Sequence, residues 1–251
     1  MFSAHMPDEK TYSRRRLAYV VEEVSQRLLV VPLRGLRPEH VPLVEASGAF
    51  VRGCWEAARG VLALARVGEY GGIAAAERQA WEMWSELDYL LLGPDPPRNG
   101  VKVQVNAFID VIELLTKLDV PAEVRENNTA GLARFESSHP EVVAEVRLQR
   151  KSQKHWSGKS RTSIVGPTDA TRSVYKVLSW ETHPDIGPIR DISTEERDGV
   201  TYLDLTVRAD VDAVVERSAS STSECLLRAW NAFAQSFGQK RIDDAPPRKA
   251  G

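Results

Sequence analysis

The stretch "IAAAERQAWEMWSELDYLLL", residues 73–92, carries the pattern from which the fold class is predicted. At about 100° per residue its side chains divide into an apolar side and a polar side, which is typical of an amphipathic helix. The apolar side comprises Ala80, Trp84, Leu87 and Leu91. The polar side comprises Arg78, Glu82, Ser85 and Tyr89. A helix of this kind has to bury its apolar side against other helices.

The same spacing recurs along most of the chain and predicts helices over residues 12–29, 41–67, 73–92, 101–118 and 211–237. Two shorter, polar helices are expected from Pro121 and Pro140, because proline suits a first helical turn. "GPDPPRNG", residues 93–100, is predicted to interrupt helical structure. "GVTYLDLTV" alternates like a strand. The fold class is therefore mostly α, a multi-helix bundle with one minor β hairpin or extended strand near residues 199–207.

Length and composition describe an ordinary globular chain. It has 251 residues and a formal net charge of −2, which argues against a general attraction to nucleic acid or membranes. We expect a disordered N-terminus over residues 1–10, a single helical domain over 11–240 and a disordered tail over 241–251. No apolar run reaches the ~18 residues of a membrane span. We therefore expect a cytoplasmic protein with no membrane partner, and its cysteines, Cys54 and Cys225, as unpaired thiols.

A polar stripe stands out in "TRSVYKVLSWETHPDIG", residues 171–187. If the stretch is helical, the polar side chains that fall within roughly 80° of one another are Arg172, Tyr175, Ser179 and His183. Arginine holds phosphates bidentately, and histidine moves protons near neutral pH, so the stripe suits phosphodiester chemistry. The alternative is that Pro184 ends the helix and His183 caps its last carbonyls.

Arg78, Glu82, Ser85 and Tyr89 form a second polar stripe, within roughly 60° on the helical wheel. It is either a solvated helix face or one wall of a cleft opposite the first stripe. In the second case Glu82 lies near His183 and Arg172 as a catalytic group, and Arg78 and Tyr89 contact the ligand.

A basic stretch, "RLQRKSQKHWSGKSR", covers residues 147–161 and contains no acidic residue. Such a segment can hold phosphates and stack a base, or it can be a solvated connector. Its candidate ligand-binding residues are Lys154, Trp156, Lys159 and Arg161.

Other kinds of site find no support in the sequence. His139, His155 and His183 are scattered, and no paired cysteines accompany them, so we expect no metal and no cofactor. The G-x-S-x-G turn of many serine hydrolases is absent.

The order of motifs resembles a family of uncharacterised, all-helical bacterial proteins known only as a domain of unknown function. The resemblance rests on Arg78, Glu82 and "YLL" at residues 89–91, then "HWSGKS" and "VYKVLSWETHPD", and it spans residues 41–187. It implies a helical bundle and draws attention to Arg78, Glu82, Tyr175, Ser179 and His183. The arrangement is also similar to the HEPN domains of toxin and defence ribonucleases, whose hallmark is Arg-x-x-x-x-His within one helix. In this chain Leu178 stands at the arginine position.

Three functions are compatible with these observations. The leading hypothesis is a bacterial cytoplasmic protein that binds a phosphate-bearing ligand or RNA, in a toxin or defence context. The second is a metal-independent ribonuclease of HEPN-like type, with His183 as acid and base and with Arg172 or Arg78 on the phosphate. The third is a non-enzymatic scaffold that acts as a homodimer. The sequence does not decide whether the protein is an enzyme.

Overall fold

The computed structural model describes residues 12–28, 35–67, 71–118, 120–152, 154–159, 163–164, 193–197, 200–204 and 211–243. Its helices are α1 (Tyr12–Leu28), the short 3-10 turn η1 (Pro38–His40), α2 (Val41–Val67), α3 (Gly71–Leu92), α4 (Pro96–Lys117), α5 (Ala122–Ser138), α6 (Pro140–Lys151) and α10 (Val211–Ser236). Its strands are β1 (Ser193–Arg197) and β2 (Val200–Asp204). The predicted fold class, mostly α, is confirmed in this part of the chain.

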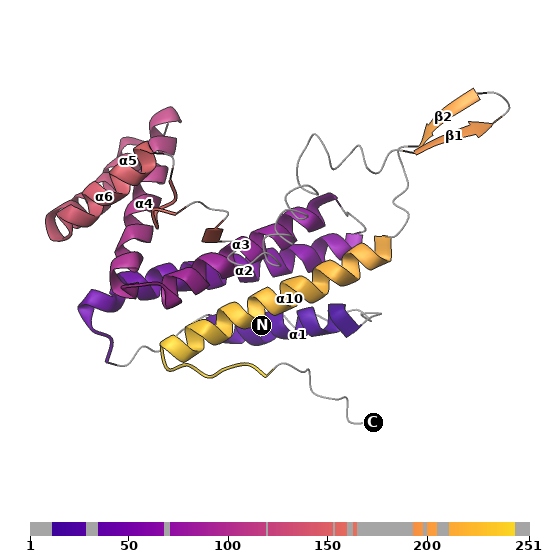
Figure 1. Cartoon of the computed structure of the whole chain (residues 1–251), viewed down its shortest axis with the longest axis horizontal. Coiled ribbons are helices and arrows are strands. Elements are labelled where there is room, and N and C mark those ends of the chain that lie inside the picture. Colours follow the sequence, from indigo (N-terminus) through magenta and orange to yellow (C-terminus); the bar gives the residue numbers. More distant parts are fainter. Residues whose placement is uncertain are drawn as a thin grey trace.

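Helices α1, α2, α3 and α10 pack side by side into a bundle (Figure 1). Their apolar stripes meet in one large core that includes Leu17, Val51, Leu87 and Trp230. Trp230 is 1% exposed, and its indole nitrogen donates to the carbonyl of Lys240 at 3.0 Å. Leu87, on the apolar side predicted for residues 73–92, is buried as expected. Trp84 and Leu91 are only half-buried at the edge of this core.

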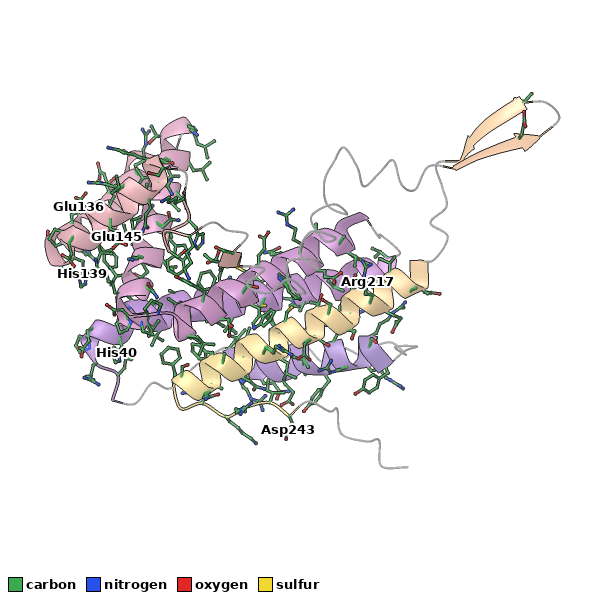
Figure 2. All side chains as sticks on the ribbon, in the orientation of Figure 1. His40, Glu136, His139, Glu145, Arg217 and Asp243 are labelled. Carbon is green, nitrogen blue, oxygen red and sulfur yellow. The ribbon has the colours of Figure 1, made fainter. Side chains whose placement is uncertain are left out.

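Helices α4, α5 and α6 form an arm at one end of the bundle (Figure 1), with a core of its own. That core contains Val101, Val105, Leu132, Val142, Val143 and Val146. Phe108 and Ile112 are half-buried against it. Lys102 is 9% exposed and donates to Glu145 of α6 at 2.6 Å, which ties α4 to α6 in the arm. Figure 2 labels Glu145 on the arm.

The arm joins the bundle where α4 crosses α2, and this junction corrects one prediction. The interruption expected over residues 93–100 is shorter than predicted, because α4 already begins at Pro96. A proline has no backbone N–H, but at the first two positions of a helix an N–H would have no partner within the helix, so prolines are tolerated there. Asp95 caps the helix by accepting from the backbone N–H of Arg98. Gly100 then allows close approach: a Cβ there would lie 2.5 Å from the Leu43 backbone.

The hairpin pairs β1 with β2 in an antiparallel register, with Ser193 opposite Asp204 and Arg197 opposite Val200. It contacts no other described element, and Figure 1 places it apart from the helices. The expected helix that carries Arg172 to His183, together with Leu178, lies outside the described residues.

Candidate functional site

The chain that follows α6 turns back onto α3 at residues 154–159. The backbone N–H of Gly158 donates to the carbonyl of His155 at 2.8 Å, and that of His155 donates to Lys159 at 3.2 Å. Gly158 has φ +77, a left-handed conformation that favours glycine. This tight turn presents His155 and Trp156 to α3.

Glu86 of α3 receives both of these side chains. Its carboxylate accepts from Trp156 Nε1 at 3.0 Å, and its other oxygen lies 2.7 Å from His155 Nε2. The Glu86 side chain is 7% exposed. A carboxylate so far from solvent has to be paired, and here one donor faces each oxygen. We missed Glu86 in the sequence because it belongs to neither stripe of the helical wheel.

Trp156 closes the junction between bundle and arm. It is 5% exposed and packs with Leu43, Ala46 and Leu90. Its ring also meets Tyr89 edge-on, with centroids 5.7 Å apart. The prediction that Trp156 stacks on a base is therefore wrong: its ring is taken up by packing, and its N–H by Glu86.

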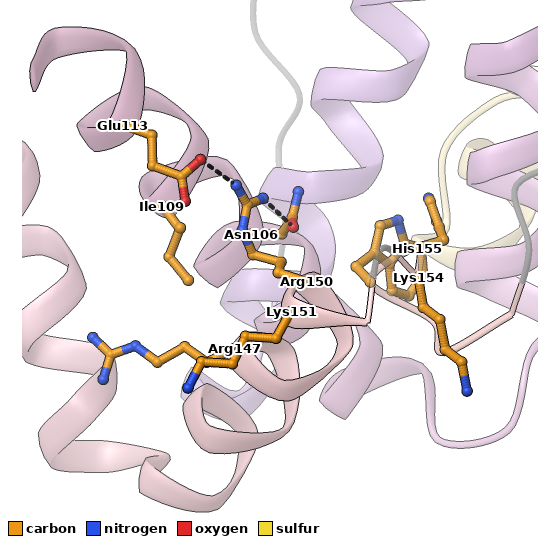
Figure 3. A pocket seen from close by; sticks show the side chains of 9 residues that line it. Asn106, Ile109, Glu113, Arg147, Arg150, Lys151, Lys154 and His155 are labelled. Atoms are coloured by element: carbon orange, nitrogen blue, oxygen red, sulfur yellow. Dashed lines mark hydrogen bonds and ion pairs between the residues drawn. The ribbon is translucent and has the colours of Figure 1, made fainter. Parts of the chain in front are cut away.

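A groove of about 680 Å³ opens between α4 and α6. We call it the cationic groove, and Figure 3 shows its side chains. Its lining residues are Asn106, Ile109, Glu113, Arg147, Arg150, Lys151, Lys154, His155 and Trp156. Arg147, Arg150 and Lys151 come from α6, and Lys154 and His155 from the turn behind it. The basic stretch, residues 147–161, therefore supplies one wall of the cationic groove.

The cations of the groove differ in how far they are neutralised. Arg150 donates to Asp110 at 2.6 Å, to Glu113 at 2.7 Å and to the Asn106 amide oxygen at 2.9 Å. Arg147 is paired with Glu136 of α5. Lys151 and Lys154 are exposed, and no carboxylate of the described residues pairs with either. Among the described residues, these two lysines therefore hold the positive charge of the groove that no carboxylate neutralises.

Tyr89 and Lys159 lie at a second, smaller cavity of about 330 Å³, which also involves Trp84 and Asp88. The Lys159 ammonium lies 5.0 Å from the centre of the Tyr89 ring, within reach of a cation–π contact. Burial raises the pKa of Asp88, and the nearby Arg228 opposes that rise. Tyr89 and Lys159 therefore line a different cavity from Lys154.

Arg78 and Glu82 line neither cavity. Arg78 donates to Glu82 at 2.9 Å within α3, which is the ordinary pairing of residues four apart on a helix. The remaining predicted site residues lie outside the described residues: Arg161, Arg172, Tyr175, Ser179 and His183. The expected meeting of the two polar stripes therefore stays a prediction.

Within the described residues, no three histidine, cysteine or acidic side chains gather as metal ligands. None of the described helices has the length and apolar character that crossing a bilayer requires. Comparisons with known protein families, with curated proteins and with solved structures gave no match for this chain.

Proposed function

We propose that the protein binds a phosphate-bearing chain, such as short single-stranded RNA, in the cationic groove. The observation that carries this proposal is the pair Lys151 and Lys154, which are exposed on one groove wall and have no carboxylate partner among the described residues. Ammonium groups without a partner are the ones that can exchange solvent ions for phosphates.

The spacing of the cations favours several phosphates over one. Arg147 and Lys151 lie four residues apart in α6, about one helical turn or roughly 5.4 Å along the axis, although Glu136 shares the charge of Arg147. Lys154 follows in the turn after the helix ends. Arg150 contributes less, because Asp110 and Glu113 already neutralise its charge. With few free charges, binding should be weak, and its salt dependence should be modest because the slope scales with the number of phosphates neutralised.

The test is fluorescence anisotropy of a labelled ten-nucleotide uridine RNA at several salt concentrations. The variant in which Lys151 and Lys154 are both alanine should bind more weakly. The slope of log K against log salt should become shallower by about 1.4, which is roughly 0.7 for each phosphate of a single strand that a lysine no longer neutralises. Lys240→Ala, an exposed lysine beyond α10, serves as the control and should bind like the wild type. An equal slope in all three proteins would contradict the proposal.

A homodimer is a second candidate, favoured by an apolar row on the arm. Val111, Leu114 and Leu118 lie three and four residues apart around the end of α4, and Val124 of α5 is exposed as well. A second copy of the chain could bury this row. Sedimentation velocity should then show dissociation when Leu114 and Leu118 are replaced by glutamate, and a monomeric wild type would contradict the homodimer.

The HEPN-like nuclease stays a prediction, since Arg172 and His183 lie outside the described residues.

A further inference from the structure

Ser157 extends the contact between His155 and Glu86 into a chain of three side chains. Its hydroxyl oxygen lies 3.0 Å from Nδ1 of His155, while Nε2 of the same ring lies 2.7 Å from Glu86. A hydroxyl, an imidazole and a buried carboxylate in this order are the parts of an activated serine nucleophile.

The surrounding hydrogen bonds decide where the protons lie. The backbone N–H of Ser157 points at His155 Nδ1 at 3.3 Å, and an N–H can only donate, so Nδ1 is the accepting nitrogen. The imidazole proton then belongs to Nε2, which donates to the Glu86 carboxylate. The backbone N–H of Lys159 donates to the Ser157 hydroxyl oxygen at 3.3 Å. The hydroxyl proton can then reach Nδ1 at the shorter distance of 3.0 Å, and it shares the single lone pair of Nδ1 with the Ser157 N–H at 3.3 Å.

We propose that Ser157, His155 and Glu86 form a nucleophilic triad that hydrolyses carboxylic esters. Ser157 is the nucleophile, His155 the general base, and Glu86 the positioning residue that holds the imidazole tautomer. The two ring nitrogens exchange the roles they have in chymotrypsin-type serine proteases, where Nε2 faces the serine. The inference goes beyond RNA binding, because it rests on the side chains of the triad and not on the ammonium groups of Lys151 and Lys154.

The reaction needs no co-reactant except water. The Ser157 oxygen attacks the ester carbonyl carbon while its proton passes to Nδ1 of His155. The bond to the alcohol oxygen then breaks, and that oxygen takes the proton from His155, which leaves an acyl-serine. Water attacks the acyl group, gives one proton to His155 and releases the acid, and His155 returns the proton to Ser157. Ester and water become acid and alcohol.

The position of Ser157 suits this role. It is partly exposed, whereas Glu86 is buried behind His155. Its neighbours His155 and Lys159 line the cationic groove and the smaller cavity respectively, so space for a substrate lies on both sides of the turn. Gly158 in its left-handed conformation follows Ser157 and turns the chain back, so that the Lys159 carbonyl accepts from the His155 N–H.

The test is covalent labelling of the full-length protein with a biotinylated fluorophosphonate on a neutral linker. The Ser157 oxygen displaces fluoride from phosphorus, and peptide mapping identifies the labelled serine. Labelling is expected at Ser157, should be lost in Ser157→Ala, and should persist in Ser152→Ala, an exposed serine at the end of α6. His155→Gln and Glu86→Gln should label at least about 10-fold more slowly. Hydrolysis of p-nitrophenyl acetate by the same proteins should follow the same order.

The pH dependence of the labelling rate distinguishes a catalytic role of these residues from a purely structural one. The wild-type labelling rate should fall as the pH is lowered, because a protonated imidazole accepts no proton, whereas the His155→Gln rate should not change. Thermal melting of Glu86→Gln checks that the variant is folded. An unlabelled native protein, label on another serine, or wild-type labelling of Ser157→Ala would overturn the triad. RNA binding without labelling overturns the triad alone, and labelling without RNA binding overturns only the proposed function.

Discussion

Replacing Gly100 with alanine should destabilise the protein, although alanine is the better helix former. Gly100 lies within α4, where this helix crosses the start of α2. A Cβ at this position would lie 2.5 Å from both the N and the Cα atom of Leu43, and 2.9 Å from the carbonyl carbon of Pro42. These are backbone atoms, so no side-chain rotation relieves the contact. The two helices have to separate.

Two opposing effects set the size of the loss. Alanine in a helix interior is favoured over glycine by about 1 kcal/mol. Overpacking typically costs about 1–3 kcal/mol, and a backbone clash belongs at the upper end of that range. We therefore expect Gly100→Ala to lower the free energy of unfolding by about 2 kcal/mol.

Gly48→Ala in α2 is the matched control, because a Cβ there meets nothing within 4 Å. It should raise the free energy of unfolding by up to about 1 kcal/mol, so the two variants should differ by about 3 kcal/mol. Urea unfolding followed by tryptophan fluorescence and circular dichroism measures both, with the slope against denaturant checked for constancy. If Gly100→Ala proves as stabilising as Gly48→Ala, α4 does not cross α2 as closely as described.

Two further predictions concern titratable groups. Burial favours the neutral form of Glu145, but hydrogen bonds from Lys102 and Arg98 outweigh it and hold the pKa of this carboxyl below its ordinary value of 4.5. The charged carboxylate therefore stabilises the fold above pH 4.5, and this stabilisation is lost as the pH falls through the lower pKa of the folded state. The difference in stability between the wild type and Glu145→Gln should therefore shrink when urea unfolding is repeated at increasingly acidic pH. Burial also raises the pKa of the Cys54 and Cys225 thiols, so a thiol-specific disulfide reagent at mildly alkaline pH should modify both only after unfolding in urea. Rapid modification of the native protein would contradict their burial.

Local apolar spacing was enough to predict most of the helices and the sides that they bury. Helix α2 has the predicted bounds, Val41–Val67, and α3 and α10 differ from expectation by only one or two residues. Apolar spacing is a local property of the sequence, so it predicts the buried side of a helix without knowledge of the helices that pack against it. The start of α4 was misjudged because prolines break a helix in its interior but suit its first turn, and the pattern alone does not distinguish the two positions.

Contacts between polar residues that are far apart in the sequence could be identified from the tertiary structure but not from the local pattern. Glu86 and Trp156 are 70 residues apart, and no periodicity connects a helix with a turn at that distance. The sequence drew attention to the charge of residues 147–161, but it could not show that Arg147 and Arg150 are paired while Lys151 and Lys154 meet no carboxylate in the part of the chain that the structure describes. Nor could it show that Trp156, in a basic stretch, is buried. Hydrophobic burial follows from local pattern, whereas pairing between distant polar groups depends on how the helices pack together.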